Sequence, residues 1–356
     1  MALIDQLQAK LQRHPKRIVF PEGNDPRILQ AARQFATRRL GVPILLGDRS
    51  EIKAHAAQLD LRLDGMRLLE PDRSEDFALF LPAVRAMPRF SDCDVDGAQA
   101  ILRDHNYFAA LMMMHGRADA FVGGATTTAS NALRPLFHVI PRQEGVNAAS
   151  SMLLLDMEET KLGLNGVLLL ADCGVIPEPD ADQLADIAVT TADIGHHLTG
   201  QLPRVGFLSF ASRPGEAAHA SITRIRQAVA RAREKAARRG LLAEFDGELQ
   251  ADAALDPGIA SFKNLNDSPV AGRANVLIFP DLNAGNIASK LLLQVALARG
   301  YGQIITGLQK PCAEISRSAH AIDIFGTAIL VGCQAINRQL LYGTPTQEQD
   351  NAAPTS

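Results

Sequence analysis

Short apolar runs alternate with segments of helical periodicity along this 356-residue chain, and this alternation constrains its fold more than any other feature. Near-continuous apolar runs are typical of strands buried on both faces of a parallel sheet. Strands that alternate with helices form βαβ units. We therefore expect an α/β fold, with strands in seven segments: Arg17–Gly23, Val42–Gly47, Ala118–Gly124, Gly166–Cys173, Arg204–Ser212, Asn275–Asp281 and Gln303–Pro311.

Composition and charge exclude several classes of partner. The chain has 36 Lys and Arg against 39 Asp and Glu, which gives a formal net charge of −3. Together with the absence of Trp and the presence of only three Tyr, this argues against nucleic acid as a partner. The N-terminal segment Met1–Arg17 lacks the apolar core of a signal peptide, and the longest uncharged stretch, Ile324–Asn337, is too short for a membrane span. We expect a cytoplasmic protein without a membrane partner.

The cysteines and the usual nucleotide motifs point in the same direction. Cys93, Cys173, Cys312 and Cys333 are far apart and form no C-x-x-C pair, so they read as reduced, mostly buried thiols rather than a zinc or redox site. No P-loop sequence occurs, no G-x-G-x-x-G follows a predicted strand, and no H-E-x-x-H is present. The sequence therefore predicts no metal site and gives no support for a nucleotide cofactor.

A Gly-rich, hydroxyl-rich segment follows the third predicted strand. It spans Gly123–Asn131 and precedes a predicted helix over Ala132–Val139. Glycines let a backbone approach a ligand closely, and a helix start offers free N–H donors with a positive dipole end. Arg134, one turn into the helix, adds guanidinium donors. The segment predicts an anion site, and plain helix capping with tight packing is the alternative.

A second polar segment follows the last predicted strand. After Gly307–Pro311, we expect a helix that carries Ser316 and Arg317 near its start and Asp323 two turns further along, on roughly the same face as Ser316. A hydroxyl, a guanidinium and a carboxylate that face one cleft can bind an oxyanion and move a proton. A capping serine beside a surface ion pair is the alternative.

Two more strand ends run into polar turns. These turns are Ser209–Gly215, with Ser209 and Ser212, and Asp281–Ile287, with Asn283 and Asn286. Ligands of open α/β sheets bind at the carboxyl ends of strands, so these turns point to one shared crevice. The arginines and lysine between Arg224 and Arg239 lie on one predicted helix, and we expect them to form a solvated face.

Eight segments in order resemble one family. They are RIVFPEGNDPRILQAA, HNYFAALMMMHGRADAFVGGA, LRPLFHVI, LLLADCGVIPEPDADQLADIA, RVGFLSFASRPG, ELQADAAL, ANVLIFPDLNAGNIASK and GLQKPCAEISRSAHAID, and they cover roughly residues 17–341. The chain is similar in these segments to the phosphate acetyl/butyryl transferase family, which includes the phosphate acetyltransferases. The resemblance implies reversible transfer of an acetyl group between coenzyme A and phosphate, by direct attack of the thiolate on acetyl phosphate.

The resemblance also implies an architecture. It implies two α/β domains with mainly parallel sheets and an active-site cleft between them, as in isocitrate and isopropylmalate dehydrogenases. We expect residues 1–145 plus 301–342 in the first domain, 146–300 in the second, and a disordered tail over 343–356. The implied protein is a homodimer that needs no cofactor and acts on coenzyme A, acetyl phosphate and phosphate.

Residue roles follow from the same resemblance. Ser316 would stabilise the tetrahedral oxyanion, Arg317 would hold the phosphate, and Asp323 would deprotonate the thiol. The remaining substrate-binding candidates are Arg134, Arg85, Thr127, Thr128, Ser209, Ser212, Asn283 and Asn286. Cys312 lies close to Ser316 in sequence, but we expect it to be a packed residue and not a nucleophile.

Two departures from the family pattern leave alternatives open. The family often has a histidine where this chain has Thr127, and an aspartate where it has Asn131. These changes bear on acyl preference or on activity. Transfer of a larger acyl group, such as propionyl or butyryl, is therefore one alternative. A non-catalytic acyl-CoA-binding regulatory protein is the other, although the chain retains Ser316, Arg317 and Asp323.

Overall fold

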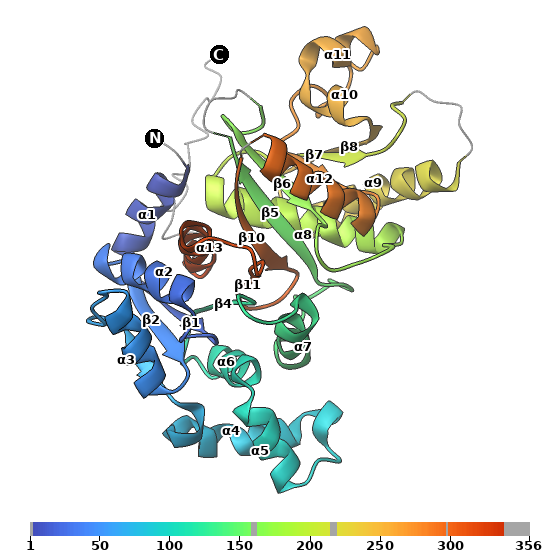
Figure 1. Cartoon of the computed structure of the whole chain (residues 1–356). Helices are drawn as coiled ribbons and strands as arrows, with labels where there is room; N and C mark the ends of the chain where they lie inside the picture. The colour runs from blue at the N-terminus through green and yellow to red at the C-terminus, as the bar shows by residue number, and fades with distance from the viewer. Residues whose placement is uncertain (1–2, 158–161, 214–218, 297, 338–356) are drawn as a thin grey trace, which may run out of the picture.

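The computed structural model describes residues 3–157, 162–213, 219–296 and 298–337. Within these residues the strands form one 11-stranded sheet in the order β3-β2-β1-β4-β11-β10-β5-β6-β9-β7-β8 (Figure 1). The strands are β1 (Lys16–Phe20), β2 (Gly41–Leu46), β3 (Arg67–Leu69), β4 (Ala120–Gly123), β5 (Ser150–Asp156), β6 (Val167–Ala171), β7 (Arg204–Leu208), β8 (Glu244–Leu249), β9 (Val276–Ile278), β10 (Arg299–Thr306) and β11 (Cys312–Glu314).

Helices cover both faces of this sheet. They are α1 (Leu3–Arg13), α2 (Pro26–Thr37), α3 (Arg49–Gln58), α4 (Glu75–Ala86), α5 (Val95–Arg103), α6 (His105–Met114), α7 (Ala129–Val139), α8 (Ala181–Thr199), α9 (Ala220–Arg238), α10 (Ala251–Leu255), α11 (Pro257–Phe262), α12 (Leu282–Val295) and α13 (Ala321–Gln334), with short 3₁₀ turns at Pro71–Arg73 and Pro88–Phe90. None of the helices in the described ranges is long and apolar enough to span a bilayer.

The predicted α/β class is confirmed, and each of the seven predicted segments overlaps a strand. The sheet is mainly parallel, because only the pairs β11–β10, β10–β5 and β5–β6 run antiparallel within the described residues. Four strands were not predicted, namely β3, β5, β8 and β11. The division into two domains stays a prediction, and the expected disordered tail at 343–356 lies outside the described residues.

The buried core differs between the two faces of the sheet. On one face a single cluster runs through both ends of the sheet and contains side chains of α1, α2, α8, α9 and α13. On the other face there are two clusters, one beneath α4–α7 and one beneath α10–α12. In Figure 1, β11 and β10 lie between these two groups of helices. The loops at the ends of β4 and β11 therefore lie at the middle of the molecule.

The basic helix α9 corrects one expectation from the sequence. Its cations do not form a purely solvated face, because several anchor α9 to its neighbours. Arg226 pairs with the fully buried Glu248 of β8 at 2.7 Å, Arg231 pairs with Asp182 of α8 at 2.8 Å, and Lys235 pairs with Asp186. The charged residues of α9 therefore form ion pairs with β8 and α8, while its small apolar residues pack against the core.

A glycine sets the close approach of α13 to β10. A Cβ at Gly326 would lie 2.2 Å from Cε1 of Tyr301 and 2.4 Å from its Cδ1, and the Tyr301 side chain is almost fully buried. No rotation of a packed ring opens that space, so the helix can lie at this depth only with glycine. This contact matters for the site because α13 begins directly after the Ser316 loop.

We predict that Gly326→Ala lowers the free energy of unfolding by about 1–3 kcal/mol through overpacking against Tyr301, despite the better helix propensity of Ala. Urea unfolding measures this change. Gly332→Ala in the same helix is the matched control, because its added methyl group would meet only the ends of aliphatic side chains, Leu11 at 3.1 Å and Ile18 at 3.5 Å. Equal effects of the two substitutions would contradict the explanation.

Candidate active site

Two loops far apart in the sequence lie side by side at the centre of the sheet. β4 and β11 are parallel neighbours, with Gly123 opposite Glu314. The pairing continues one residue beyond β11, because the N–H of Ile315 donates to the carbonyl of Gly123 at 2.8 Å. The Gly-rich segment after β4 and the Ser316 loop after β11 therefore leave the sheet together.

The carboxylate of Glu22 holds the Gly-rich loop. Glu22 follows β1, the other neighbour of β4, and accepts hydrogen bonds from the backbone N–H groups of Gly124, Ala125 and Thr126 at 2.7–2.8 Å. The Thr126 hydroxyl donates to it as well, at 2.9 Å. An internal carboxylate therefore occupies these three N–H groups. The anion site expected at the start of the following helix stays a prediction.

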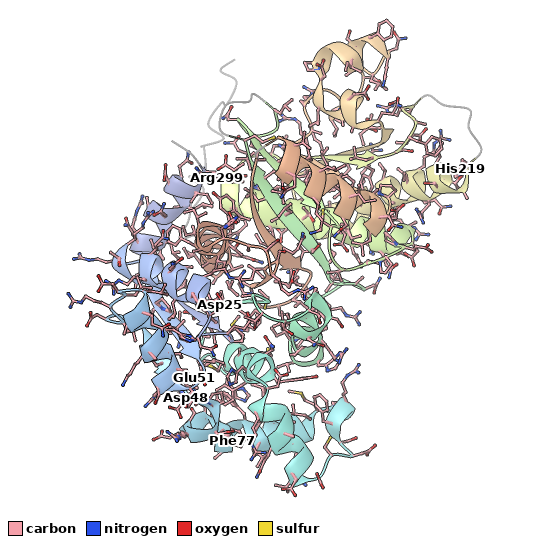
Figure 2. All side chains as sticks on the ribbon, in the orientation of Figure 1. Asp25, Asp48, Glu51, Phe77, His219 and Arg299 are labelled. Carbon is pink, nitrogen blue, oxygen red and sulfur yellow. The ribbon has the colours of Figure 1, made fainter. Side chains whose placement is uncertain are left out.

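Arg27 joins the same loop to the Ser316 loop. Its guanidinium donates to the carbonyls of Arg317 at 2.6 Å, Ala319 at 3.2 Å and Ala125 at 2.8 Å. It also pairs with Asp25, the N-cap of α2, at 2.9 Å. Burial alone would raise the pKa of Asp25, but hydrogen bonds and charge from Arg27 outweigh it, so the pKa is lowered. Figure 2 shows Asp25 at the start of α2 beside the centre of the molecule.

The Ser316–Asp323 segment differs from the predicted helix. Cys312–Glu314 form strand β11, Ser316 and Arg317 lie in an exposed loop, and α13 begins only at Ala321. Ser316 and Asp323 therefore do not share a helix face. The correction has a physical cause, since β4 and β10 flank this segment and supply ladder partners that local sequence does not reveal.

The side chains in this segment have definite partners. The Ser316 hydroxyl lies 2.9 Å from that of Ser318 and accepts the Ser318 N–H at 3.3 Å. Asp323 is half-buried in the first turn of α13, where its carboxylate accepts the N–H of His320 at 2.9 Å. The Arg317 guanidinium is exposed and forms no hydrogen bond or ion pair with the described part of the chain. Arg317 is thus available to an external anion.

Glu314 is the most perturbed carboxyl group beside these loops. It is only 9% exposed, at the end of β11, two residues before Ser316. Burial raises its pKa to about 7, the negative charge of Glu22 adds to that rise, and Lys290 of α12 partly opposes it. A carboxyl group with such a pKa can exchange a proton near neutral pH, which makes it suited to acid–base chemistry.

The structure places the Gly-rich residues on or before α7. This helix begins at Ala129, earlier than predicted, and Thr128 is its N-cap, accepting the Asn131 N–H at 3.3 Å. Thr127 is half-buried between this cap and the loop held by Glu22. Arg134 is exposed and donates to Ser130 at 3.4 Å. Asn131, a departure from the family pattern, thus lies in the first turn of α7.

The other candidates lie on separate elements. Arg85 is exposed in the last turn of α4, and this helix lies in the lower part of the molecule in Figure 1. Ser212 accepts the N–H of Gln250, and Asn286 on α12 donates to the carbonyl of Cys173 at 3.1 Å. Asn283 is exposed in the first turn of α12, while Ser209 accepts the Ala211 N–H at 3.4 Å. Their roles in substrate binding stay predictions.

Cys312 is fully buried in β11, and burial raises the pKa of its thiol. A protonated, inaccessible thiol cannot attack a substrate, which agrees with the expectation of a packed residue. In the part of the chain that the structure describes, no group of three or more His, Cys, Asp or Glu side chains is placed to hold a metal ion.

Comparison with known proteins decides the family. A family model described as phosphate acetyl/butaryl transferase matches residues 2–331. The chain belongs to this family. A phosphate acetyltransferase of Acetivibrio thermocellus is 36% identical over 338 residues, which cover 94% of this chain and 98% of the relative.

Solved structures agree with this membership. The EutD phosphotransacetylase of Staphylococcus aureus superposes with a TM-score of 0.84 at 31% identity, over 94% of this chain and 98% of that one. The 4-hydroxythreonine-4-phosphate dehydrogenase of Klebsiella pneumoniae gives a TM-score of 0.51 at 12% identity, over 90% and 100% of the two chains. The second likeness concerns the fold alone, and it matches the dehydrogenase-like architecture expected from the sequence.

Sequence reasoning missed three residues of this phosphate acetyl/butaryl transferase family member. Glu22 and Arg27 lie inside a segment that resembles the family, which does not by itself indicate their role, and no sequence pattern marks Glu314. A signal was present for Glu22, because it ends the first predicted strand and carboxyl ends of neighbouring parallel strands meet at one edge. The burial of Glu314 could not be read from the sequence, since it depends on strands β4 and β10 on either side.

We predict that Glu314→Gln stabilises the protein at alkaline but not at acidic pH. The folded chain holds the Glu314 proton up to a pH of about 7, whereas the unfolded chain releases it near 4.5, so wild-type stability falls as pH rises through this window. The variant lacks this loss, which has an upper limit of about 3 kcal/mol.

Urea unfolding at pH 5 and at pH 8 measures the difference. Glu75→Gln, at an exposed carboxylate in the first turn of α4, is the matched control and should show no such pH dependence. A stability difference between wild type and Glu314→Gln that stays constant with pH would show that Glu314 titrates normally.

Proposed function

We propose that this chain is a phosphate acetyltransferase that catalyses acetyl-CoA + phosphate = coenzyme A + acetyl phosphate. One observation carries the proposal. In a chain that matches its family over residues 2–331, the segment with Ser316, Arg317 and Asp323 is complete and lies beside the Gly-rich loop. The relatives named above as phosphate acetyltransferase and phosphotransacetylase support the same activity.

Arg317 holds the phosphate in this proposal. A guanidinium offers parallel N–H donors that match two phosphate oxygens, and this contact fixes the acyl phosphate for attack. Its backbone carbonyl is already held by Arg27, which positions the residue while the side chain stays exposed to the ligand. The Ser316 hydroxyl donates to the oxygen that becomes negative when the carbonyl carbon turns tetrahedral.

Asp323 removes the proton from the coenzyme A thiol. A thiol with an ordinary pKa of about 8.5 is mostly protonated at neutral pH, and the thiolate is the nucleophile. The S–C bond then forms as the C–O bond to phosphate breaks, so no covalent acyl-enzyme is needed. Arg134, Arg85, Thr127, Thr128, Ser209, Ser212, Asn283 and Asn286 are proposed to bind the substrates, and the reaction requires no metal or redox cofactor.

Two other functions make different predictions. A larger acyl group, propionyl or butyryl, would react by the same chemistry, and one methylene changes binding in a pocket by only about 1–3 kcal/mol. A ranking of kcat/KM for acetyl, propionyl and butyryl phosphates decides between them. A non-catalytic regulatory protein would bind coenzyme A and form no thioester with any of the three.

We predict that Asp323→Asn lowers kcat by about 10²–10⁴-fold with little change in KM, because a general base is lost. The amide oxygen can still accept the His320 N–H, so the helix start should be preserved. Thioester formation from coenzyme A and acetyl phosphate measures the effect. Asp180→Asn, at the capped start of α8, serves as the control. Wild-type turnover in Asp323→Asn would remove it from the mechanism.

We also propose that the protein is a cytoplasmic homodimer. The four cysteines form no disulfide, as is usual in a reducing compartment. An apolar stripe on α12 supports the dimer, since Ile287, Leu291 and Val295 recur every fourth residue and are 58%, 57% and 78% exposed. A second copy of this stripe would cover these side chains in a two-fold symmetric contact.

We predict that Leu291→Asp converts the dimer into a monomer, because a carboxylate at the centre of the stripe would lose its hydration on association. Sedimentation velocity measures the oligomeric state. Leu242→Asp, at another exposed apolar side chain outside α12, is the control and should leave the dimer intact. A Leu291→Asp protein that sediments like wild type would exclude α12 as the interface.

A further inference from the structure

Glu314 and Ser316 extend from the same side of one extended segment. Side chains two residues apart on a strand point to the same face, with Cα atoms about 7 Å apart. Ile315 lies between them and is 1% exposed, so its side chain points into the core. Glu314 therefore faces the side from which the Ser316 loop emerges.

The surroundings of Glu314 leave its carboxyl group without a partner. It packs on the backbone of Gly124, where a Cβ would lie 3.2 Å from Oε1. Within the described residues it accepts no hydrogen bond and forms no ion pair, although it is 9% exposed. The charged groups that act on it are Glu22, which is held by the Gly-rich loop, and Lys290 of α12. The carboxyl group is thus mostly buried but keeps some contact with solvent, and no group of the described residues satisfies it.

The reaction itself requires a second proton transfer. When the C–O bond of acetyl phosphate breaks, the departing phosphate must gain a proton, because the fully ionised trianion is a poor leaving group. In the reverse direction, phosphate must lose that proton as it attacks acetyl-CoA. Asp323, which takes the thiol proton, does not supply this proton in the same step. Arg317 binds the phosphate but holds no proton that it can give up near neutral pH.

We propose that Glu314 is the acid–base residue on the phosphate side of the reaction, donating a proton to the departing phosphate and recovering it in the reverse direction. This inference rests on the proposed function, and it deepens the assignment of that site. Asp323 and Glu314 then divide the proton chemistry between the thiol and the phosphate.

The step balances in atoms and charge. The coenzyme A thiol loses its proton to Asp323, and its sulfur forms the bond to the carbonyl carbon. The C–O bond electrons pass to the phosphate oxygen, which takes the proton from Glu314 and leaves as HPO₄²⁻. Asp323 is then protonated and Glu314 ionised, and proton exchange with solvent restores both. The reactive enzyme carries its proton on Glu314 and not on Asp323.

The environment of Glu314 suits this role. With a pKa of about 7, the group is still protonated over a large part of the neutral range, and its acidity is close to that of the phosphate it serves. Burial and the nearby charge of Glu22 both favour the protonated form. Lys290 of α12, an exposed side chain, partly opposes them.

The test is the pH dependence of wild type relative to Glu314→Gln. kcat/KM for acetyl phosphate is measured from pH 5.5 to 9 at fixed coenzyme A, and the wild-type value is divided by that of the variant. Ionisations of the substrates cancel in this ratio. We expect a ratio of about 10² below pH 7 that falls up to tenfold per pH unit above it. The reverse reaction must show the same ratio, because both directions share one transition state.

Other outcomes would overturn the inference. A ratio above one that does not change with pH would show that Glu314 is merely structural. A variant as active as wild type would show that the carboxyl group takes no part. Glu75→Gln, in the first turn of α4, is the matched control and should give a ratio of one. An inactive wild-type protein that binds coenzyme A would instead refute the proposed function itself.

A second variant covers the case in which Glu314→Gln does not fold. Glu314→Asp keeps the carboxyl group but shortens the side chain. We therefore expect a lower kcat/KM that still falls at alkaline pH in both reaction directions. A folded Glu314→Asp protein whose kcat/KM does not fall at alkaline pH would contradict the inference, since its carboxyl group would still be available to titrate.

Discussion

The contacts made by Glu22 and Arg27 hold together segments that are otherwise far apart in the sequence. Glu22 binds three consecutive N–H groups after β4, and Arg27 binds carbonyls both there and in the loop after β11. Hydrogen bonds with one charged partner are stronger than neutral ones, so these contacts can fix two exposed loops. Without them, strand pairing alone would position Gly123 and Glu314 but not the residues beyond.

This arrangement gives the Gly-rich loop a structural role that its sequence does not reveal. Glycine at 124 is required because a Cβ would lie 2.8 Å from the carbonyl of Ile315 and the residue has a positive φ of 108°. The loop is thus shaped for close packing against the neighbouring strand and for an internal carboxylate. The exposed guanidinium of Arg317, beside this loop, is available to a substrate anion. The negative charge of Glu22 then acts on Glu314, which links the packing of the loop to acid–base chemistry.

The strands that were predicted have continuous apolar sequence, although β5, which has an apolar centre and is fully buried, was missed. β8 (Glu244–Leu249) alternates charged with apolar residues, and β3 and β11 each span only three residues, so local sequence gives them little signal. β11 matters most, because overlooking it led to the wrong helix around Ser316. That segment became a strand since β4 and β10 supply its hydrogen-bond partners, and such partners are set by tertiary structure.

The sequence by itself determined the α/β class, most strands, and the family through segments that keep their order along the chain. It also identified Ser316, Arg317 and Asp323 as candidates, because residue types and their spacing can be read directly from the sequence. The tertiary structure alone decided which of the loop N–H groups are occupied, how deeply Glu314 is buried, and where α13 begins. These properties depend on neighbours more than a hundred residues away, and burial, charge proximity and strand pairing exist only once those neighbours are in place.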